Sequence, residues 1–418
     1  MANLSLLPNS FSPASLAIGR AYAAHFWRPA KVQEWLDIVL AVLIWPAGVL
    51  FCALWVTLKN GRVVASRFGR SMIKQFGDQL KLTATSGLMP PWYYVFELYR
   101  PGAMSRARGF FTRGQTKYGA YQILAKARGS ASPLSDKEAF ARFCAERQVA
   151  AIPVLLSVRD GEVRGDVRSA SDLPKCDLFV KPVCGRGGRG AERWDYAGGL
   201  YRGPEILNSI QFIERLREMS RVQPYLVQRR AENHSSIRNL SNGALNTIRM
   251  ISCLDEHDRP EIVAAVLRMA VGRNVTVDNV HAGGLAAAID LVEGRLGQAT
   301  DMGIDAHLGW IDRHPDTNGR IAGRALPFWS EVCDLARHAH FAFRDWSVIG
   351  WDIAVMPGGP RLVEGNCGPD IDLVQRPLRK SFGDSRFGEL LAFQLERFQG
   401  EHCRARTALA GAASPGSA

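Results

Sequence analysis

The longest apolar run of this chain lies near its N-terminus. No charged residue occurs from Ile38 to Leu58, a stretch of 21 residues. As a helix rising 1.5 Å per residue it would be about 31 Å long, which matches the hydrocarbon thickness of a bilayer. Tryptophans, which suit membrane interfaces, are spaced along it: Trp35, Trp45 and Trp55. The run predicts a membrane helix over residues 35–60, with a buried core helix as the alternative.

Two residues within this run leave its path open. Pro46 and Gly48 lie near its middle, so the segment either crosses the bilayer or enters and leaves by one face as a re-entrant hairpin. A cleavable signal peptide is not expected, because the run starts late, is too long and lacks a clear small-residue cleavage site.

From about residue 135 the pattern changes to short runs with strand or helix periodicity. Seven runs predict strands, at residues 151–158, 178–183, 225–228, 247–253, 262–269, 351–355 and 361–363. Two amphipathic runs predict helices: Ala139–Arg147, capped by Ser135, and Pro204–Val222. Mixed helices and strands indicate an α/β or α+β domain over residues 131–398.

The rest of the chain divides into three further segments. Residues 1–34 carry no strong pattern, and residues 61–130 have a mainly helical one. Residues 399–418 end in Ala, Gly, Ser and Pro, a composition that predicts a disordered tail.

The net charge of +12 is concentrated in one segment. Residues 61–130 hold twelve Lys or Arg and only two acids, Asp78 and Glu97, so this segment alone carries +10. Basic residues just after a membrane helix favour the cytoplasmic side and anionic headgroups. We therefore predict a protein of the inner (cytoplasmic) membrane with the domain at residues 131–398 facing the cytoplasm. Nucleic acid is the rival explanation for the charge, but no nucleic-acid-binding motif accompanies it.

The eight cysteines are scattered with no C-x-x-C spacing. They are typical of free thiols in a reducing compartment and do not indicate a metal site or a disulfide framework.

Acidic and amide side chains recur on the last two predicted strands. Asp352 lies on the first, and Glu364 and Asn366 lie two apart on the second, so alternation places all three on one face. An all-oxygen cluster with two carboxylates suits Mg²⁺ bridged to nucleotide phosphates. The plain alternative is a polar strand face exposed to solvent.

A glycine-rich loop follows the predicted strand that ends near Lys181. Its glycines are Gly185, Gly187, Gly188 and Gly190. The residues after it are polar and strand-like, which excludes a dinucleotide-binding helix, and no G-K-[ST] follows, which excludes a Walker A loop. Such a loop offers backbone N–H groups to phosphates, with Lys181 beside it. By itself, a flexible hairpin explains it equally well.

Two arginines are further candidates for phosphate contacts. Arg249 would share a strand face with Thr247, and Arg268 lies on the next strand, before the segment that contains Asn279. Arg is well suited to clamp phosphoryl oxygens. A surface ion pair is the ordinary explanation for either residue alone.

Taken in order, these motifs resemble the ATP-grasp superfamily. The chain is most similar to the ribosomal-protein glutamate ligase type and to the sugar-transfer-associated ATP-grasp group, over residues ~90–398. Asp352 with Glu364-x-Asn366 is the most specific part. The resemblance implies an α+β ATP-grasp fold in which two subdomains clasp ATP.

The resemblance also implies roles for individual residues. The nucleotide-binding set would be Lys137, Lys181, Gly185, Gly187, Gly188, Gly190, Val227, Gln228, Glu232 and Asn279, with Val227 and Gln228 at the adenine and Glu232 at the ribose. Arg249, Arg268 and Lys181 would steady the transferred phosphoryl group. Asp352, Glu364 and Asn366 would bind Mg²⁺.

The sequence departs from the family pattern at two places. The position two residues before the first metal acid, often an arginine, is Gly350. After Asn366 comes a segment containing Asp370 and Asp372, which would help to shape an acceptor pocket.

The implied function is an ATP- and Mg²⁺-dependent ligase. It would join a carboxylate to an amine or a thiol through an acyl phosphate, in cell-surface polysaccharide or sugar-precursor modification. Expected partners are the two unidentified substrates, the membrane surface and a glycosyltransferase or exopolysaccharide machinery. The alternatives are an ATP-dependent phosphotransferase and a non-catalytic, membrane-tethered ATP-binding partner of a glycosyltransferase.

Overall fold

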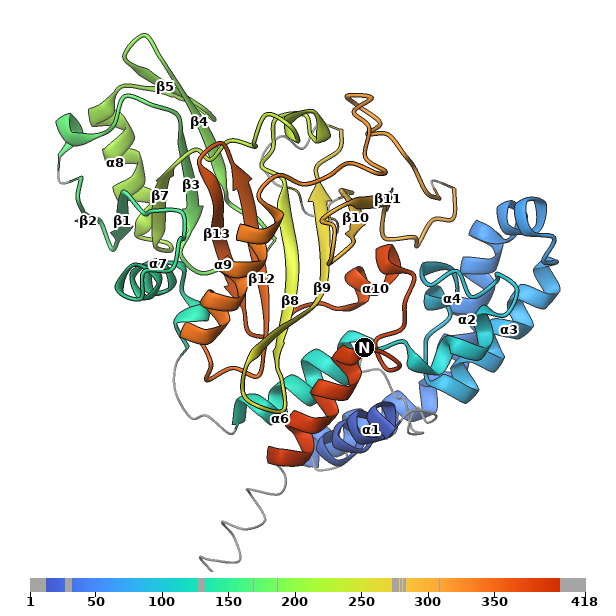
Figure 1. Ribbon diagram of the computed structural model, residues 1–418. Coiled ribbons are helices and arrows are strands. Elements are labelled where there is room, and N and C mark those ends of the chain that lie inside the picture. The colour runs from blue at the N-terminus through green and yellow to red at the C-terminus, as the bar shows by residue number, and fades with distance from the viewer. Residues whose placement is uncertain are drawn as a thin grey trace, which may run out of the picture.

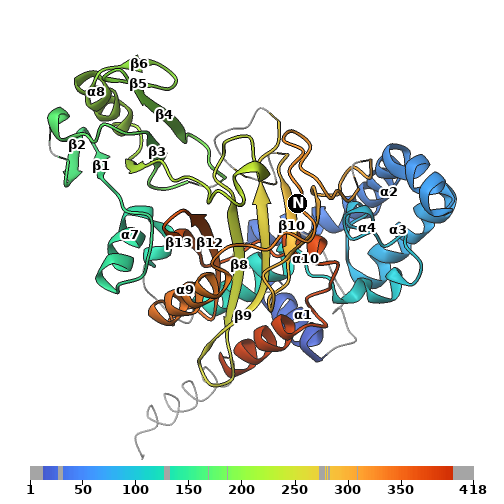
Figure 2. The same ribbon diagram turned by 45° about the horizontal axis from the view of Figure 1, so that its top comes forward.

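A computed structural model describes most of the chain as two antiparallel sheets and a separate group of helices (Figure 1). The described residues are 13–26, 32–126, 132–167, 169–185, 187–272, 278, 280, 283–307 and 309–398. The predicted tail at 399–418 therefore lies outside the described residues. The six-stranded sheet lies at the centre, with the seven-stranded sheet on one side and the helices of residues 32–109 on the other, and Figure 2 shows the same order. The helices of residues 13–26 and 121–126 lie beneath the central sheet in Figure 1.

The central sheet has the strand order β11-β10-β9-β8-β12-β13. Its strands are β8 (Thr247–Leu254), β9 (Pro260–Met269), β10 (Leu285–Ile289), β11 (Leu296–Thr300), β12 (Val348–Met356) and β13 (Gly359–Asn366). Strand alternation sends Ile248 and Met250 into a core under α9 (Trp329–Ala342). It sends Ile251 and Cys253 to the opposite core, which contains the helix at residues 386–398. Both faces of this sheet are thus covered.

The second sheet has the order β2-β1-β7-β3-β4-β5-β6. Its strands are β1 (Leu156–Arg159), β2 (Glu162–Gly165), β3 (Leu178–Pro182), β4 (Glu192–Ala197), β5 (Leu200–Arg202), β6 (Ile206–Leu207) and β7 (Tyr225–Arg229). The helix α8 (Ser209–Ser220) packs Phe212, Ile213 and Leu216 against it. Short helical turns η3 (Pro133–Ser135) and η4 (Ala170–Asp172) and the helix α7 (Lys137–Glu146) complete this part of the chain.

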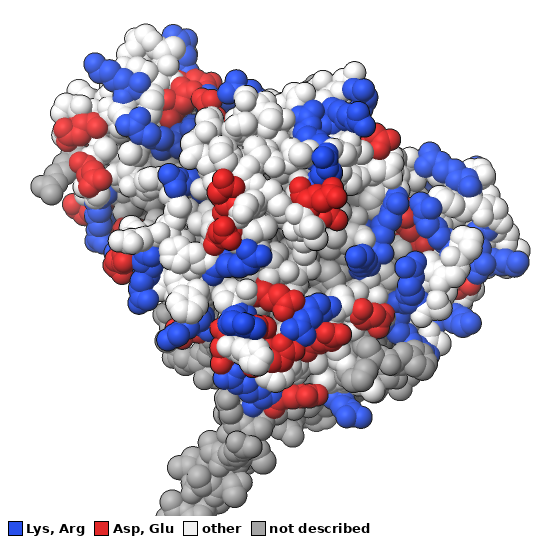
Figure 3. Space-filling view, in the orientation of Figure 1, with Lys and Arg blue, Asp and Glu red and all other residues white. Residues whose placement is uncertain are grey.

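The helical region contains the basic segment and is mainly helical, as predicted. It comprises α1 (Pro13–Phe26), α2 (Val32–Phe68), α3 (Met72–Ser86), α4 (Pro91–Val95), η1 (Ala103–Gly109), α5 (Arg113–Gln115), the π-helical turn η2 (Thr116–Ala120) and α6 (Tyr121–Lys126). Figure 3 shows more Lys and Arg than acidic side chains over the part formed by α2, α3 and α4. The helix α10 (Asp372–Leu378) lies between this region and the central sheet.

The helix α2 contains the apolar run and is continuous. It passes through Pro46 without a turn, so the structure shows no re-entrant hairpin there, and it extends beyond the expected boundary at residue 60. The part of α2 from Val42 to Phe68 is long and apolar enough to cross a membrane. Only 22% of its most apolar 18-residue stretch is buried inside the protein. Large apolar side chains along it are exposed, Leu43 and Phe51 by more than 70%. A buried core helix does not match this exposure.

Two predicted helix starts were wrong. Asp136, not Ser135, caps α7, because its carboxylate accepts hydrogen bonds from the N–H groups of Glu138 and Ala139, both at 2.9 Å. The helix α8 begins at Ser209 behind an Asn208 cap, and the residues after Pro204 form β6 instead. In both cases a nearby Asp or Asn side chain caps the helix, at a residue later than the expected start.

Several helices were not predicted, among them α1, α9, α10 and the helix at residues 386–398. The residues that form α1 show no strong pattern in the sequence, yet Ile18 and Ala21 are buried in the same core as the helix at residues 386–398. The two helices are far apart in the sequence, so no pattern within either segment shows that they pack together.

Candidate active site

The predicted acidic cluster assembles on β12 and β13. These strands pair with Asp352 opposite Glu364 and Gly350 opposite Asn366, which confirms the predicted common face. The side chain of Asp352 is only 4% exposed. The amide Nδ2 of Asn366 lies 3.5 Å from the Glu364 carboxylate. Three oxygen-bearing side chains thus meet at one end of the strand pair.

Two arginines from the neighbouring strands hold Asp352. On β8, Arg249 donates from Nε to one carboxylate oxygen at 2.6 Å and from a terminal nitrogen to the other at 3.1 Å. On β9, Arg268 donates to Asp352 at 3.0 Å. Burial would raise the pKa of Asp352, but the guanidiniums of Arg249 and Arg268 outweigh it and hold that pKa below its usual value. Asp352 is therefore an ionised, clamped carboxylate.

Glu364 has a different electrostatic environment. Burial and the adjacent negative charge of Asp352 raise its pKa, and the charge of Lys181 only partly opposes this. In the described residues no third His, Cys, Asp or Glu joins these two acids in a metal-binding group. A cation between Asp352 and Glu364 would relieve their repulsion.

Lys181 reaches this cluster from β3 of the other sheet. It is almost fully buried, and burial lowers its pKa to about 8, although the charge of Glu364 opposes the shift. No hydrogen bond joins its ammonium to any residue in the described part of the chain. The second predicted lysine, Lys137 at the start of α7, donates to the carbonyls of Val183 and Gly185, at 3.4 and 3.1 Å. Lys137 thus fixes the start of the glycine-rich loop.

The glycine-rich loop joins β3 to β4, as predicted from its position between two strands. Four of its glycines have positive φ: Gly185 at 146°, Gly187 at 69°, Gly188 at 72° and Gly190 at 73°. Residues with a Cβ rarely adopt these conformations, so the loop requires glycine for its shape. The loop begins four residues after Lys181, and Lys137 bonds to its first residue, Gly185.

The predicted adenine and ribose contacts are placed as follows. The Val227 side chain is in the hydrophobic core of the seven-stranded sheet, and its carbonyl accepts the Leu155 N–H at 2.9 Å. The Gln228 amide donates to the carbonyl of Ile152 at 2.9 Å. Glu232 is exposed and pairs with Arg238 at 3.6 Å, on the segment that connects the two sheets. Asn279 lies outside the described residues.

Two further groups at the site were not among the predicted site residues. Asp278, which is buried, accepts from the Thr247 N–H at 2.7 Å and from its hydroxyl, and lies 3.4 Å from Arg268. The sequence signal was weak, because a single acid 31 residues from Thr247 has no periodic relation to it.

The second group comes from the helical region. Lys117 lies 3.0 Å from Asp370, and Arg113 lies 3.1 Å from Asp372. Burial would raise the pKa of Asp370, but Arg113, Lys117 and Arg249, in that order, outweigh it and lower that pKa. The expected acceptor-pocket acids are thus joined to basic residues about 250 positions earlier in the chain, which no local pattern could indicate.

The departure at Gly350 has a steric cause. A Cβ there would lie 2.6 Å from the Cβ of Pro369. The loop after Asn366 therefore occupies the space that an arginine side chain at this position would need, and Arg249 and Arg268 supply the positive charge from neighbouring strands.

Comparison with known protein families identifies the family of this chain. The family model of the sugar-transfer associated ATP-grasp proteins matches residues 120–382, more than half of the chain. The chain belongs to this family. The family resemblance expected from the motifs is thereby confirmed, and with it the ATP-grasp fold of two antiparallel sheets with helices. No curated protein sequence is significantly similar to the chain.

Several solved structures match the chain at low identity and low TM-score. An ADP complex of N5-carboxyaminoimidazole ribonucleotide synthetase is 10% identical, with a TM-score of 0.36 over 65% of this chain and 55% of that one. The D-alanine–D-alanine ligase of Bacillus anthracis is 13% identical, with a TM-score of 0.35 over 64% and 69%. The L-amino acid ligase of Bacillus licheniformis is 11% identical, with a TM-score of 0.35 over 63% and 48%.

Within the ATP-grasp fold, the residues fit a magnesium–nucleotide pair. Mg²⁺ is usually held by one or two carboxylates together with substrate phosphates, and Asp352 and Glu364 offer two. Lys181, buried without a hydrogen-bond partner in the described structure, would gain one from a phosphate oxygen. Asn366 donates from its amide nitrogen to Glu364 at 3.5 Å, so its amide oxygen is the atom it would offer to a cation.

Proposed function

We propose that this protein is an ATP- and Mg²⁺-dependent ligase that joins a carboxylate to an amine or a thiol through an acyl phosphate. The observation that carries the proposal is the charge cluster shared by the two sheets. Asp352 lies clamped by Arg249 and Arg268 with Glu364 opposite, and Lys181 reaches it from the other sheet. Buried cations and anions in this arrangement suit a reaction that spreads negative charge over a transferred phosphoryl group.

The proposed chemistry needs no protein nucleophile. When bound, Mg²⁺ would neutralise phosphate charge, held by Asp352, Glu364 and Asn366. Lys181 would orient the phosphates under the glycine-rich loop. Arg249 and Arg268, already oriented by Asp352, would keep the carboxylate and phosphoryl groups together, so catalysis would rest on positioning and charge neutralisation.

The first test is nucleotide binding to the full-length protein in detergent. A ligand at 100 times its dissociation constant stabilises by about 2.7 kcal/mol, which raises the melting temperature of a domain this size by a few degrees. We expect this shift with Mg-ATP, less with AMP, and none in the Glu364→Gln, Asn366→Ala variant. Asp334→Asn, an exposed acid on α9, is the matched control. A wild-type protein that melts identically with and without Mg-ATP would overturn the proposal.

The second test separates a ligase from a phosphotransferase. Hydroxylamine attacks an acyl phosphate to give a hydroxamate and free phosphate, whereas a phosphorylated alcohol is inert to it. Carboxylates that stimulate ADP release should therefore give hydroxamates in its presence. ADP release with a stable phosphorylated product and no hydroxamate would favour the phosphotransferase.

We further propose that the enzyme acts at the inner (cytoplasmic) membrane, with its catalytic domain in the cytoplasm, on a polysaccharide or sugar precursor. The support is the exposed apolar surface of α2, the basic segment that follows it, and the sugar-transfer family. A glycosyltransferase or exopolysaccharide assembly would be its partner. Protease digestion of the catalytic domain from the cytoplasmic face alone tests this orientation, and digestion from the opposite face would refute it.

A further inference from the structure

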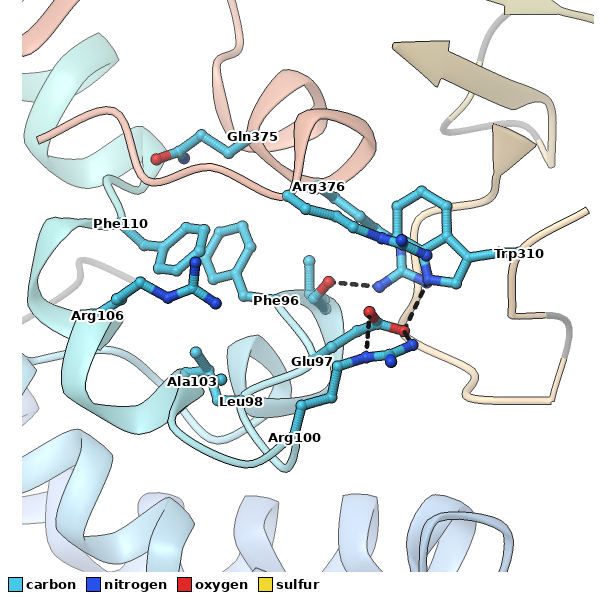
Figure 4. A pocket seen from close by; sticks show the side chains of 12 residues that line it. Phe96, Glu97, Leu98, Arg100, Ala103, Arg106, Phe110, Trp310, Gln375 and Arg376 are labelled. Atoms are coloured by element: carbon cyan, nitrogen blue, oxygen red, sulfur yellow. Dashed lines mark hydrogen bonds and ion pairs between the residues drawn. The ribbon is translucent and has the colours of Figure 1, made fainter. Parts of the chain in front are cut away.

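A cavity lies where the helical region meets the ATP-grasp domain (Figure 4). The segment from α4 to η1 forms one wall, and α10 with Trp310 forms the other. The volume of the cavity, taken as the space open to the centres of water molecules, is about 80 Å³. Neither Lys181 nor Glu364 lines it, so it is distinct from the candidate active site.

The cavity carries an excess of positive charge. One acid lines it, Glu97, together with four arginines: Arg100, Arg106, Arg376 and Arg379. Glu97 is already fully engaged, since it accepts from Arg100 Nε and from Trp310 Nε1, both at 2.8 Å. Glu97 therefore neutralises the charge of Arg100, and the charges of the other three arginines need partners of their own.

Arg376 is likewise committed to the protein. Its buried guanidinium donates to Thr300 and to the carbonyl of Asp301, both at 3.1 Å, and to the carbonyl of Val95. Figure 4 shows it lying along Trp310, on the side of the cavity away from Phe96. This arginine joins the helical region to the central domain.

Two guanidiniums remain without a carboxylate. In the described structure neither Arg106 nor Arg379 forms an ion pair. Arg106 extends toward Phe96 (Figure 4), and Arg379 lies 3.6 Å from the centre of the Trp310 ring. Burial lowers the pKa of Arg379, and the charge of Glu97 partly opposes this. Two exposed arginines without an ion pair to any described residue, both lining one cavity, attract an anion.

The backbone at this cavity is also unusual. Glu97 and Arg379 both have φ of 51°, a left-handed conformation that residues with a Cβ rarely adopt. Such strain persists only where surrounding contacts enforce it, and it recurs at ligand sites. Here it turns the two side chains toward the same cavity from opposite walls.

We propose that this cavity binds the phosphate group of an organic phosphate. One water needs about 10–15 Å³ of such room, so the cavity holds about five to eight atoms of that size, which suits a phosphate but not a nucleotide. Paired guanidiniums match phosphate oxygens in geometry and charge. The rings of Phe96, Phe110 and Trp310 would contact the carbon skeleton attached to it. The phosphate would belong either to a lipid headgroup or to a soluble sugar or glycerol phosphate.

This site does not depend on nucleotide binding, so it is tested without ATP. The melting temperature of the full-length protein is measured in neutral detergent, in mixed micelles with phosphatidic acid, and with glycerol phosphate at constant ionic strength. Micelles carrying oleate provide equal negative charge without phosphate. We expect an increase of several degrees with phosphatidic acid and little change with oleate. An equal increase with glycerol phosphate would show that a free phosphate suffices.

Variants locate the effect. Arg106→Gln, an exposed side chain, should weaken the phosphate-dependent shift, and Arg106→Gln with Arg379→Gln should abolish it. Arg62→Gln with Lys81→Gln removes the same charge from exposed positions outside the cavity and should leave the shift intact. The proposal is overturned if no phosphate probe shifts the wild-type protein, or if the control pair loses as much of the shift as the cavity pair.

Discussion

Lys181 shows how one buried residue links stability to ligand binding. Its ammonium is held in the interior without a hydrogen bond to the described residues, and burial has lowered its pKa to about 8 from 10.5. The folded protein therefore binds this proton less tightly than the unfolded chain does. Below pH 8 the buried charge destabilises the fold, and the penalty is relieved as the pH rises from about 8 to 10.5.

Replacing Lys181 by methionine should stabilise the ligand-free protein while removing its response to ATP. At 1.36 kcal/mol per pKa unit, the free energy of unfolding at pH 7 should rise by up to about 3 kcal/mol. The gain should shrink as the pH passes from 8 to 10.5. Urea unfolding at several pH values measures it. Lys137→Met, which removes an ammonium bonded to two carbonyls, is the control and should not stabilise. A Lys181→Met protein less stable than wild type at pH 7 would show that the amine has a stabilising partner.

Gly350 is a second residue with a defined steric role. A Cβ there would meet Pro369, which is rigid, so Gly350→Ala should lower the free energy of unfolding by about 1–3 kcal/mol. Gly358, in the turn between β12 and β13, has open space around it, and Gly358→Ala should change stability by no more than about 0.5 kcal/mol. Denaturant midpoints of the two variants decide the matter, and equal midpoints would contradict the argument.

Among the elements, the glycine-rich loop is the one whose conformation depends most directly on residue type. Its glycines adopt positive φ between two strands that are otherwise regular. The adjacent hairpin from β4 to β5 turns through Gly198 and Gly199, which also have positive φ, at 60° and 81°. The same requirement for glycine thus occurs in the loop after Lys181 and in a second hairpin. Substitutions at the two places therefore distinguish the cost of backbone strain from an effect on nucleotide binding.

Alanine at Gly188 and at Gly198 should have similar costs for folding but different effects on nucleotide binding. Each substitution forces a Cβ into the left-handed region, at roughly 1–2 kcal/mol. Only Gly188→Ala should also reduce the rise in melting temperature caused by Mg-ATP. Thermal unfolding with and without nucleotide compares them. If Gly198→Ala loses the nucleotide response equally, the loop has no special role in binding.

At the scale of the whole molecule, α2 sets the protein's relation to its surroundings. Exposing this many large apolar side chains to water is unfavourable. We therefore expect a membrane or a partner protein to cover this surface of α2. Its C-terminal half packs against α3 and α4 and also contacts the ATP-grasp domain, since Asn60 and Arg67 bond to main-chain groups at residues 304, 306 and 307. An α2 held in a membrane would therefore place the ATP-grasp domain directly at the bilayer surface.

Polar substitution on the exposed face of α2 should release the protein from membranes. Leu43→Gln, Phe51→Gln and Leu54→Gln replace side chains that are at least half exposed, so the fold should survive. Ultracentrifugation of cell membranes should find the wild type in the pellet and much of the variant in the supernatant. Ile210→Gln with Val222→Gln, equally exposed on and after α8, is the control and should stay in the pellet. A wild-type protein found entirely in the supernatant would refute membrane association.

The sequence determined those parts of the site that depend on local periodicity. Asp352, Glu364 and Asn366 could be placed together because two strands joined by a short turn must pair, and alternation then fixes the face. The glycine-rich loop, Lys181 and the apolar run of α2 were likewise visible, because composition and spacing within a few residues decide them. The family resemblance followed from the order of these motifs.

Only the tertiary structure brought distant residues together. The contacts of Asp278 with Thr247, and of Lys117 with Asp370, join positions 31 and 253 apart. Nor did the sequence indicate that α1 packs on the catalytic core, or that Arg106 and Arg379 face one cavity from separate regions. The physical reason is common to all of them. Such contacts depend on how completed elements pack, and the free energy of that packing is not contained in the periodicity of any one segment.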